Sequence, residues 1–488
     1  MASASVLQRV SDGRSLVSPN TIVLSSPFHS HHTTTPGAIG YGVNENILSA
    51  YNFLVNNYTI GDELFFFGFS RGSFTCRSLA GLVGHFGILK QEEAGEWFAD
   101  IWGKYQRGET LEKPDLTHNV KIKVLGCWDT VGSLGIPEGS ISKFFNMNSE
   151  HAFHDTELSD SKSLHTTYSS SYSHPPVEVE NAFHALALDE HRKSFSPTLW
   201  YLPRSQVDKA PDRRTRLKQC WFAGVHTDVG RGYEDHVPGD IADITFAWMV
   251  DQCRGLLAWN KNKVPQMLEK GDHKKIPEDA APDVVQAWDD RVLKAKTWGL
   301  ADLHDSFTPM FWLGGSTTRT PGQYIFKARD AAKPKTDGSS GGSGFATKSK
   351  ILANIESVVK PWHWRLWNTA TGVFTGPPED LSKFEMVWTS EVIHPSVRMR
   401  RLHDPEYQPP ALKDFKLTYD ADRDRWSWVK RWTDDHGVPR EKKLHEYRIE
   451  EPTYALSKAD VEMLKAGTDE EDPLPPKPAS KSWIPFLR

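Results

Sequence analysis

Apolar residues in the first part of the chain recur at two spacings, one typical of helices and one typical of buried strands. Between residues 44 and 58 they fall at i, i+3, i+4, i+7, i+8 and i+11, which predicts an amphipathic helix. Glu63 to Phe69 is a short apolar run of the kind that forms a buried parallel strand. After Ser70 the spacing is helical again. This alternation of helix and strand predicts an open α/β sheet.

Later segments repeat this arrangement. Residues 120–128 and 219–225 are expected to be strands, and residues 241–256 a helix. Residues 181–192 are also expected to be helical, with His184 and His191 on one face in structural positions. Residues 21–24 are a candidate for one more strand.

Composition divides the chain into five expected parts. They are a flexible Ser-, Thr- and His-rich segment at 1–35, an α/β part at 36–327 with an insert at 159–176, a flexible loop at 328–350, a C-terminal part at 351–450 that packs on the α/β part, and a tail at 451–488. Seven of the 18 tryptophans lie between Trp362 and Trp432. Core packing of a compact lobe is the preferred interpretation of this cluster, and a ligand platform is the alternative.

The balance of positive and negative residues argues against some classes of protein function. Lys and Arg number 58 against 63 Asp and Glu, so the net charge is −5, which argues against a nucleic-acid binder. Apolar runs are only a few residues long, so we expect a cytoplasmic protein without a transmembrane segment or signal peptide. Four scattered cysteines do not form a disulfide framework. The absence of a phosphate-loop motif and of an H-E-x-x-H motif implies neither a cofactor nor a catalytic metal.

One motif carries candidate chemistry. Residues 68–72, Gly-Phe-Ser-Arg-Gly, fit the pattern G-x-S-x-G, and Ser70 follows an apolar strand and opens a helix, as in a nucleophile elbow. A serine hydroxyl is a weak nucleophile, so it must be exposed on a sharp turn beside a base. The flanking glycines leave room for such a turn. The backbone N–H of Arg71 is the expected oxyanion donor.

A matching acid and base lie downstream. In α/β-hydrolases the acid and then the histidine follow the serine along the chain, each at the carboxyl end of a strand. Asp129 and His226 meet both conditions. We therefore predict a triad in which His226 is the general base and Asp129 orients it. Asp228 stays open as an alternative acid, although its position also suits bracing of the loop that follows. The other candidate bases are His184, His191 and His394.

Five segments together resemble a known family. They are GYGVNENI at 40–47, GFSRGSFTCRSLAGL at 68–82, WDTVGSLG at 128–135, FHALALDEHR at 183–192 and AGVHTDVGRGY at 223–233. The family is the uncharacterised α/β-hydrolase family that includes the catalytic domain of type VI secretion phospholipase effectors, and the chain looks closest to its fungal branch. The resemblance covers residues 36–260. It implies a mostly parallel sheet flanked by helices, here with a Trp-rich C-terminal extension, and a serine esterase or lipase with Ser70, Asp129 and His226 at the catalytic positions.

The chain departs from the family pattern in three ways. No Asp-Gly-Thr motif precedes Gly40, where the family places a strand end near the oxyanion hole; residues 159–176 look inserted; and Arg231 stands where a glycine is usual. Two hypotheses follow. In the first, the chain is a phospholipase-like carboxyl-ester hydrolase that acts on a lipid or small-molecule ester through an acyl-enzyme. This activity is compatible with peripheral contact with a membrane. Alternatively, the chain is a catalytically impaired relative that acts as a binding or scaffold protein.

Overall fold

The computed structural model defines the chain in several stretches, which together contain the central fold. The described residues are 6–10, 21–25, 43–107, 114–131, 179–202, 215–233, 240–257, 299–306, 316–322, 325–328, 373–375, 384–386, 389–433, 437 and 439–449. The predicted insert at 159–176 and the predicted tail at 451–488 lie outside them, as does most of the predicted loop at 328–350.

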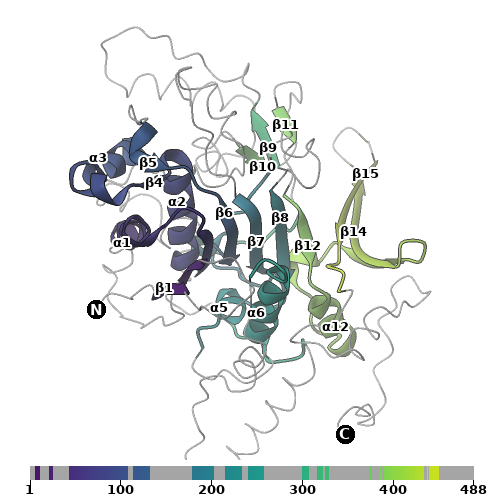
Figure 1. The fold of residues 1–488 in the computed structure, drawn as a ribbon. Helices are drawn as coiled ribbons and strands as arrows, with labels where there is room; N and C mark the ends of the chain where they lie inside the picture. Colours follow the sequence, from purple (N-terminus) through teal and green to yellow (C-terminus); the bar gives the residue numbers. More distant parts are fainter. Residues whose placement is uncertain are drawn as a thin grey trace, which may run out of the picture.

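A seven-stranded sheet forms the centre of the molecule (Figure 1). Its strands, in spatial order, are β1 (Val6–Val10), β2 (Thr21–Ser25), β3 (Glu63–Phe69), β6 (Ile122–Trp128), β7 (Val179–Ala187), β8 (Arg216–Phe222) and β12 (Glu391–Ile393). Every neighbouring pair is parallel except β1 and β2, which are antiparallel. The predicted fold class, a mostly parallel α/β sheet flanked by helices, is confirmed.

Helices cover both faces of this sheet. They are α1 (Val43–Asn57), α2 (Arg71–Phe86), α3 (Ala94–Arg107), α5 (His226–Gly230), α6 (Ile241–Gln252) and α12 (Pro395–His403). Side chains alternate between the two faces of a strand. Leu64 and Phe66 of β3 accordingly join a core with α1, α2 and α3, whereas Phe65 and Phe67 join a second core with α6. Figure 1 shows α1, α2 and α3 grouped apart from α5, α6 and α12. The sheet is therefore buried on both faces.

Smaller elements surround this centre. They are the strands β4 (Ile88–Leu89), β5 (Thr117–His118), β9 (Ile325–Ala328), β10 (Val373–Thr375), β11 (Phe384–Met386), β13 (Lys416–Asp420), β14 (Arg425–Thr433) and β15 (Pro439–His445), and the 3-10 helices η1 (Gln91–Glu93), η2 (Pro114–Leu116), η6 (Lys193–Phe195) and η11 (Pro410–Leu412). Strands β13, β14 and β15 form an antiparallel sheet that places Trp426 and Trp428 in the second core.

Most predicted elements agree with the structure, and one interpretation is wrong. The helices expected at 44–58 and 241–256, and the strands expected at 21–24, 63–69, 120–128 and 219–225, correspond to α1, α6, β2, β3, β6 and β8. Residues 181–192 do not form a helix, because Val179–Ala187 is strand β7 at the centre of the sheet. Strands β1 and β2 lie within residues 1–35. The remaining part boundaries stay predictions.

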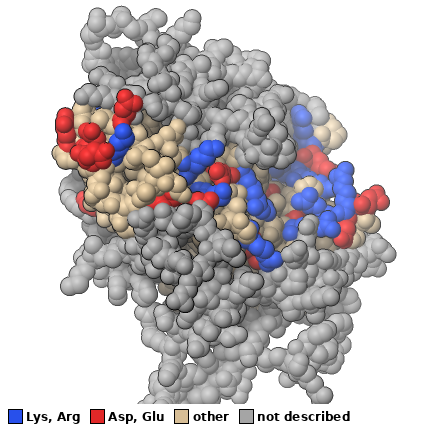
Figure 2. Space-filling model, viewed as in Figure 1, with Lys and Arg blue, Asp and Glu red and all other residues tan. Residues whose placement is uncertain are grey.

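Surface charge on the C-terminal sheet is mixed. Figure 2 shows Lys and Arg gathered toward the β14–β15 side of the molecule, with Asp and Glu beside them. Lys430 pairs with Asp414 at 2.6 Å, and Arg431 pairs with Glu441 at 2.8 Å. None of the helices in the described part of the chain is both long and apolar enough to cross a membrane.

Candidate active site

Ser70 lies on a strained turn between β3 and α2. Its backbone has φ 54° and ψ −117°, a conformation that residues with a side chain rarely adopt. The Ser70 N–H donates a hydrogen bond to the carbonyl of Trp128 at 3.0 Å, which ties the turn to the end of β6. Arg71 is the first residue of α2, so its backbone N–H lies at the helix start beside Ser70. Ser70 therefore lies on a sharp strand-to-helix turn, at the position where the sequence predicts a nucleophile elbow.

Close packing of α2 on β3 explains the first glycine of the motif. A Cβ atom on Gly68 would overlap the backbone of Gly72 and would come within 2.6 Å of the Ser73 nitrogen. The Ser73 hydroxyl donates to the carbonyls of both Gly68 and Trp128, the latter at 2.9 Å. The helix start is therefore fixed against two neighbouring strands.

The predicted acid and base occupy the ends of two further parallel strands. Asp129 follows β6, is fully buried and has φ 40°, and its N–H donates to the carbonyl of Ala185 at 2.7 Å. His226 follows β8 as the first residue of α5 and is also buried. Because the carboxyl ends of parallel strands meet at one edge of the sheet, both side chains lie at the edge that carries Ser70.

The structure brings Ser70, His226 and Asp129 into one hydrogen-bonded chain. The distance from Ser70 Oγ to His226 Nε2 is 2.8 Å, and that from His226 Nδ1 to Asp129 Oδ2 is 2.6 Å. When the Nδ1–H donates to the carboxylate, Nε2 is free to accept the serine proton. The arrangement can therefore activate a serine hydroxyl.

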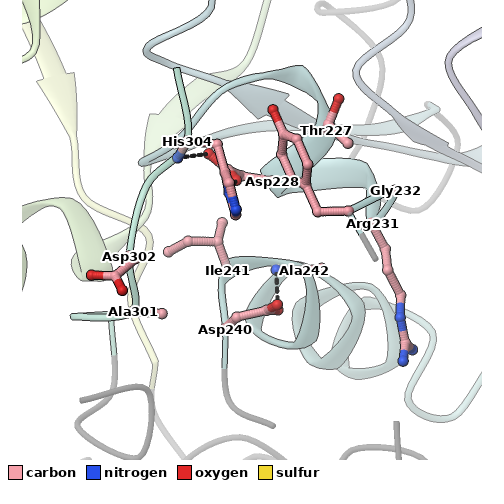
Figure 3. A pocket seen from close by; sticks show the side chains of 11 residues that line it. Thr227, Asp228, Arg231, Gly232, Asp240, Ile241, Ala242, Ala301, Asp302 and His304 are labelled. Carbon is pink, nitrogen blue, oxygen red and sulfur yellow. Dashed lines mark hydrogen bonds and ion pairs between the residues drawn. The ribbon is translucent and has the colours of Figure 1, made fainter. Parts of the chain in front are cut away.

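Asp228, the alternative acid, is engaged elsewhere. Its Oδ2 accepts from the N–H of Val225 at 2.9 Å, and its Oδ1 lies 2.5 Å from Nδ1 of His304. Figure 3 shows Asp228 and His304 facing each other in a pocket next to α5 and α6. The ring of Tyr233 stacks on His304 with centroids 3.7 Å apart. Asp228 thus caps the short helix α5 and pairs with His304, while Asp129 is the carboxylate that contacts His226.

Two aromatic rings hold the imidazole of His226. The centroid of Phe69 lies 4.7 Å away and that of Phe195 4.9 Å away, the latter edge-on. A Cβ atom on Gly230 would overlap the Phe69 ring, so this position accepts only glycine without rearrangement. The guanidinium of Arg192 covers Phe195 at 3.6 Å. The His226 ring is therefore fixed by packing as well as by hydrogen bonds.

Two charged residues of the site were missed by sequence reasoning. Arg319 binds both carboxylate oxygens of Asp129, with Nη1 at 2.5 Å from Oδ1 and Nη2 at 2.9 Å from Oδ2. Glu190 accepts from the backbone N–H of His226 at 3.2 Å and pairs with Arg192 at 2.8 Å. Glu190 lies in one of the five segments that resemble the family, so the sequence did contain a signal for this residue. Arg319 has no motif around it.

Arg319 changes the electrostatics of the acid. Burial by itself would raise the pKa of the Asp129 carboxyl. The charge of Arg319, with hydrogen bonds from His226 and Arg319, outweighs burial and holds this pKa well below its usual range. Asp129 is therefore ionised at neutral pH.

The other candidate bases have structural partners. His184 accepts from the N–H of Thr130 at 3.0 Å, and burial lowers its pKa to about 3. His394 caps α12 and contacts the Ser396 hydroxyl at 2.9 Å, and burial lowers its pKa to about 3 as well. His191 lies 3.5 Å from Asp305. Among the described residues, no group of three or more His, Cys, Asp or Glu side chains is placed to bind a metal.

Comparison with known proteins supports one family for the part of the chain that contains Ser70, Asp129 and His226. Residues 16–252, which end with the last residue of α6, match the family model described as "T6SS, Phospholipase effector Tle1-like, catalytic domain". All three residues of the hydrogen-bonded chain lie within the match. The match supports that family and the hydrolase class for these residues. The wider α/β-hydrolase assignment and the fungal branch stay predictions.

Individual relatives cover less of the chain. "Uncharacterized protein YEL023C" of Saccharomyces cerevisiae is 31% identical over 113 residues, which are 20% of this chain and only 16% of the relative. An uncharacterized protein from Pseudomonas aeruginosa matches 43% of this chain and 26% of its own at 18% identity, with a TM-score of 0.24. The Tle1 effector bound to the VgrG spike of the type 6 secretion system matches 39% and 29% at 23% identity, with a TM-score of 0.18. Both TM-scores are too low to support an inference about this chain.

Proposed function

We propose that this protein is a serine hydrolase that cleaves carboxylic esters, and that its substrates are lipid or phospholipid esters. The observation that carries the proposal is the chain of two hydrogen bonds from Ser70 through His226 to Asp129, with Ser70 on a strained turn at a helix start. The description of the matched family as a phospholipase supports a lipid ester as the substrate. The aromatic rings of Phe69 and Phe195 beside His226 suit an apolar acyl group.

The first half of the reaction forms an acyl-enzyme. Ser70 Oγ attacks the ester carbonyl carbon while its proton passes to His226 Nε2, and the imidazolium is held by Asp129. The negative charge that develops on the carbonyl oxygen faces the backbone N–H of Arg71 at the start of α2. When the tetrahedral intermediate collapses, the C–O bond to the alcohol breaks, and His226 returns the proton to the leaving oxygen.

The second half regenerates the serine. A water molecule gives a proton to His226 and attacks the acyl carbon; the bond to Ser70 Oγ then breaks, and Ser70 recovers the proton. The products are a carboxylic acid and an alcohol, so no cofactor is needed.

Strand β2 is relevant to a second backbone donor for the oxyanion, in addition to the N–H of Arg71. It is parallel to β3, with Ser25 opposite Phe67, so the chain that follows β2 leaves the sheet at the edge where Ser70 lies. This is where the family pattern has its Asp-Gly-Thr motif. Residues 26–42 lie outside the described part of the chain. A strand at this place, β2, supports the proposal, although no Asp-Gly-Thr motif follows it in the sequence.

The test of the proposal is covalent labelling by a fluorophosphonate probe, followed by ester hydrolysis. Wild type should be labelled, and Ser70→Ala and His226→Ala should abolish labelling. Hydrolysis of p-nitrophenyl acyl esters and of phospholipid vesicles should fall about 10⁴-fold or more in both variants. The control is Ser49→Ala, which removes an exposed serine of α1 and should leave both readouts unchanged.

Two outcomes contradict the proposal. If folded wild type is not labelled, the chain is the catalytically impaired relative. If labelling survives in Ser70→Ala, another residue is the nucleophile.

A further inference from the structure

Arg319 makes one hydrogen bond with each N–H of its two terminal nitrogens. Nη1 donates to Asp129 Oδ1 at 2.5 Å and to the carbonyl of Ala187 at 2.6 Å. Nη2 donates to Asp129 Oδ2 at 2.9 Å and to the carbonyl of Phe195 at 2.7 Å. The residue is only 3% exposed. A planar guanidinium that meets both carboxylate oxygens at once fixes the plane and the rotation of the Asp129 carboxylate.

The segment that carries Arg319 is docked beside the chain that follows β7. Ser316 forms an antiparallel bridge with Arg192, and the N–H of Thr317 donates to the carbonyl of His191 at 2.8 Å. At the other end, the N–H of Gly322 donates to Glu391 of β12 at 2.6 Å. The cation is therefore held in place from both sides.

A serine–histidine–aspartate triad does not require a cation next to its aspartate. Where a cation is present, as Arg319 is here, it changes the electrostatics of the triad. The acid of a triad stabilises the imidazolium that forms when histidine takes the serine proton. A buried positive charge on that same carboxylate weakens this stabilisation, because it compensates the negative charge that the imidazolium feels. Arg319 therefore fixes the Asp129 carboxylate, and at the same time it weakens the electrostatic attraction between this carboxylate and the imidazolium of His226.

We propose that Arg319 is a positioning residue of the active site: it holds Asp129 in the geometry that orients His226, and its charge compensates that of the Asp129 carboxylate. This inference rests on the proposed function, since it assigns a role within the same site. The hydrogen bonds of Arg319 go to Asp129, Ala187 and Phe195, so it acts on His226 through Asp129.

The charges around His226 are balanced in pairs. Asp129 is compensated by Arg319, and Glu190 is compensated by Arg192. Removal of Arg319 leaves one negative charge without its partner next to the imidazole. The other charged or titratable groups on the described elements around the triad include Arg71 and Arg77 of α2, His184 of β7, Lys193 of η6, and Asp228, Arg231, Tyr233 and His304. Asp228 and His304 form a pair of their own at 2.5 Å.

The pH dependence of activity separates this role from a purely structural one. Activity requires neutral His226, so kcat/KM of an activated ester falls on the acid side as the imidazole takes up a proton. In Arg319→Met the uncompensated Asp129 favours the imidazolium, and the acid limb should move to higher pH by about one unit or more. The plateau of kcat/KM should fall about tenfold to hundredfold, because Asp129 loses its brace. Arg319→Lys keeps the charge, so its acid limb should stay near that of wild type while its plateau falls.

The matched control is Arg398→Met, which breaks another buried arginine–carboxylate pair. Arg398 binds Glu446 at 3.0 Å and covers Trp426 in the C-terminal part. This variant should lose stability and keep the acid limb of wild type. An acid limb that does not move in Arg319→Met, or that moves equally in Arg398→Met, would overturn the proposal. If Arg319→Met does not fold, Arg319→Gln, which keeps a neutral donor, replaces it with the same expected shift.

A second readout does not depend on turnover. The titration of His226 is followed by NMR in histidine-labelled protein, with its signal assigned by His226→Gln. Its midpoint should lie higher in Arg319→Met than in wild type, whether or not wild type hydrolyses the ester. An inactive wild type with this shift would reject the proposed function and retain the role of Arg319, whereas an active wild type without it would do the reverse.

Discussion

Backbone strain at single residues coincides with the candidate site. Among the described residues, the non-glycine positions with positive φ include Ser70, Asp129 and Arg231, at φ 54°, 40° and 59°. Each such conformation costs on the order of 1–3 kcal/mol, so it persists only where the surroundings enforce it. At Ser70 and Asp129 the turn brings a side chain of the hydrogen-bonded chain to the edge of the sheet. At Arg231 the family pattern has glycine, for which this conformation carries no strain.

One buried histidine beside the triad gives a pH-dependent contribution to stability. Burial, with a smaller effect of Arg77, lowers the pKa of His184 to about 3, whereas an unfolded histidine titrates near about 6.5. As pH falls below that value the unfolded chain takes up a proton and folded His184 does not, so stability is full above it and is lost on acidification. Between about pH 7.5 and about pH 5.5 this loss is about 1.4 kcal/mol. His184→Asn should therefore lose about that much less than wild type over the same interval.

The measurement is the free energy of unfolding in urea at both pH values for both proteins. Asp189, whose pKa burial raises to about 6, acts in the opposite direction and is common to both. An equal loss in wild type and variant would contradict a neutral buried His184.

The meeting of Ser70, Asp129 and His226 could be predicted because it depends on local sequence and one general rule. Each residue follows an apolar run, and parallel strands bring their carboxyl ends to one edge. Arg319 could not be predicted in the same way. It lies 190 residues from Asp129 along the chain, outside any strand or motif, and its position depends on how a loop docks.

At the scale of elements, the tight contact between β3 and α2 determines the shape of the elbow. A methyl group at Gly68 would overlap backbone atoms of Gly72, which cannot move without displacing the helix. Gly68→Ala should therefore destabilise the protein by several kcal/mol, about 3 or more, and reduce ester hydrolysis. The matched control is Gly84→Ala on α2, because a Cβ atom added at Gly84 would meet nothing within 4 Å. It should stabilise the protein by about 0.5–1 kcal/mol.

Urea unfolding of the two glycine variants checks this prediction. If Gly68→Ala were as stable as Gly84→Ala and retained full hydrolysis, the close approach of α2 to β3 would not be needed for the elbow.

Strand β7 illustrates why a central element can be misread. Phe183 and Ala185 lie in one core and Ala182 in the other, so the strand is apolar on both faces and lacks the alternation of a half-buried strand. A continuous apolar run cannot be distinguished by periodicity from a buried helix. Strand β12 was missed for a different reason. It has only three residues, and its place beside β8 is set by contacts far along the chain.

At the scale of the whole molecule, the C-terminal part is joined to the α/β part through shared structure. Strand β12 extends the central sheet, and its Glu391 accepts from Trp221 Nε1 of β8 at 2.9 Å and from the N–H of Gly322 at 2.6 Å. The same carboxylate therefore joins the central sheet to the segment that carries Arg319. Burial raises the pKa of Glu391. The geometry of the site thus depends on Glu391, which lies 391 − 252 = 139 positions beyond the end of the family match.

This coupling predicts that a core mutation in the C-terminal sheet will affect activity. Trp428 of β14 is fully buried, faces Leu417 and Leu444 across the sheet, and belongs to the same core as α6 and β8. Trp428→Ala should cost about 3–5 kcal/mol. Because the core is shared, the loss should appear as one unfolding transition at a lower temperature, and ester hydrolysis should disappear at the same temperature.

Calorimetry and residual hydrolysis after heating provide the two midpoints. Trp432→Ala is the control on the same strand, since Trp432 is only partly buried near the end of the hairpin and its loss should cost far less. A separate early transition in Trp428→Ala, with hydrolysis preserved beyond it, would mean that the C-terminal sheet unfolds on its own. A single lowered transition would mean that the two parts form one cooperative unit, in which the C-terminal part stabilises the segment that positions Asp129.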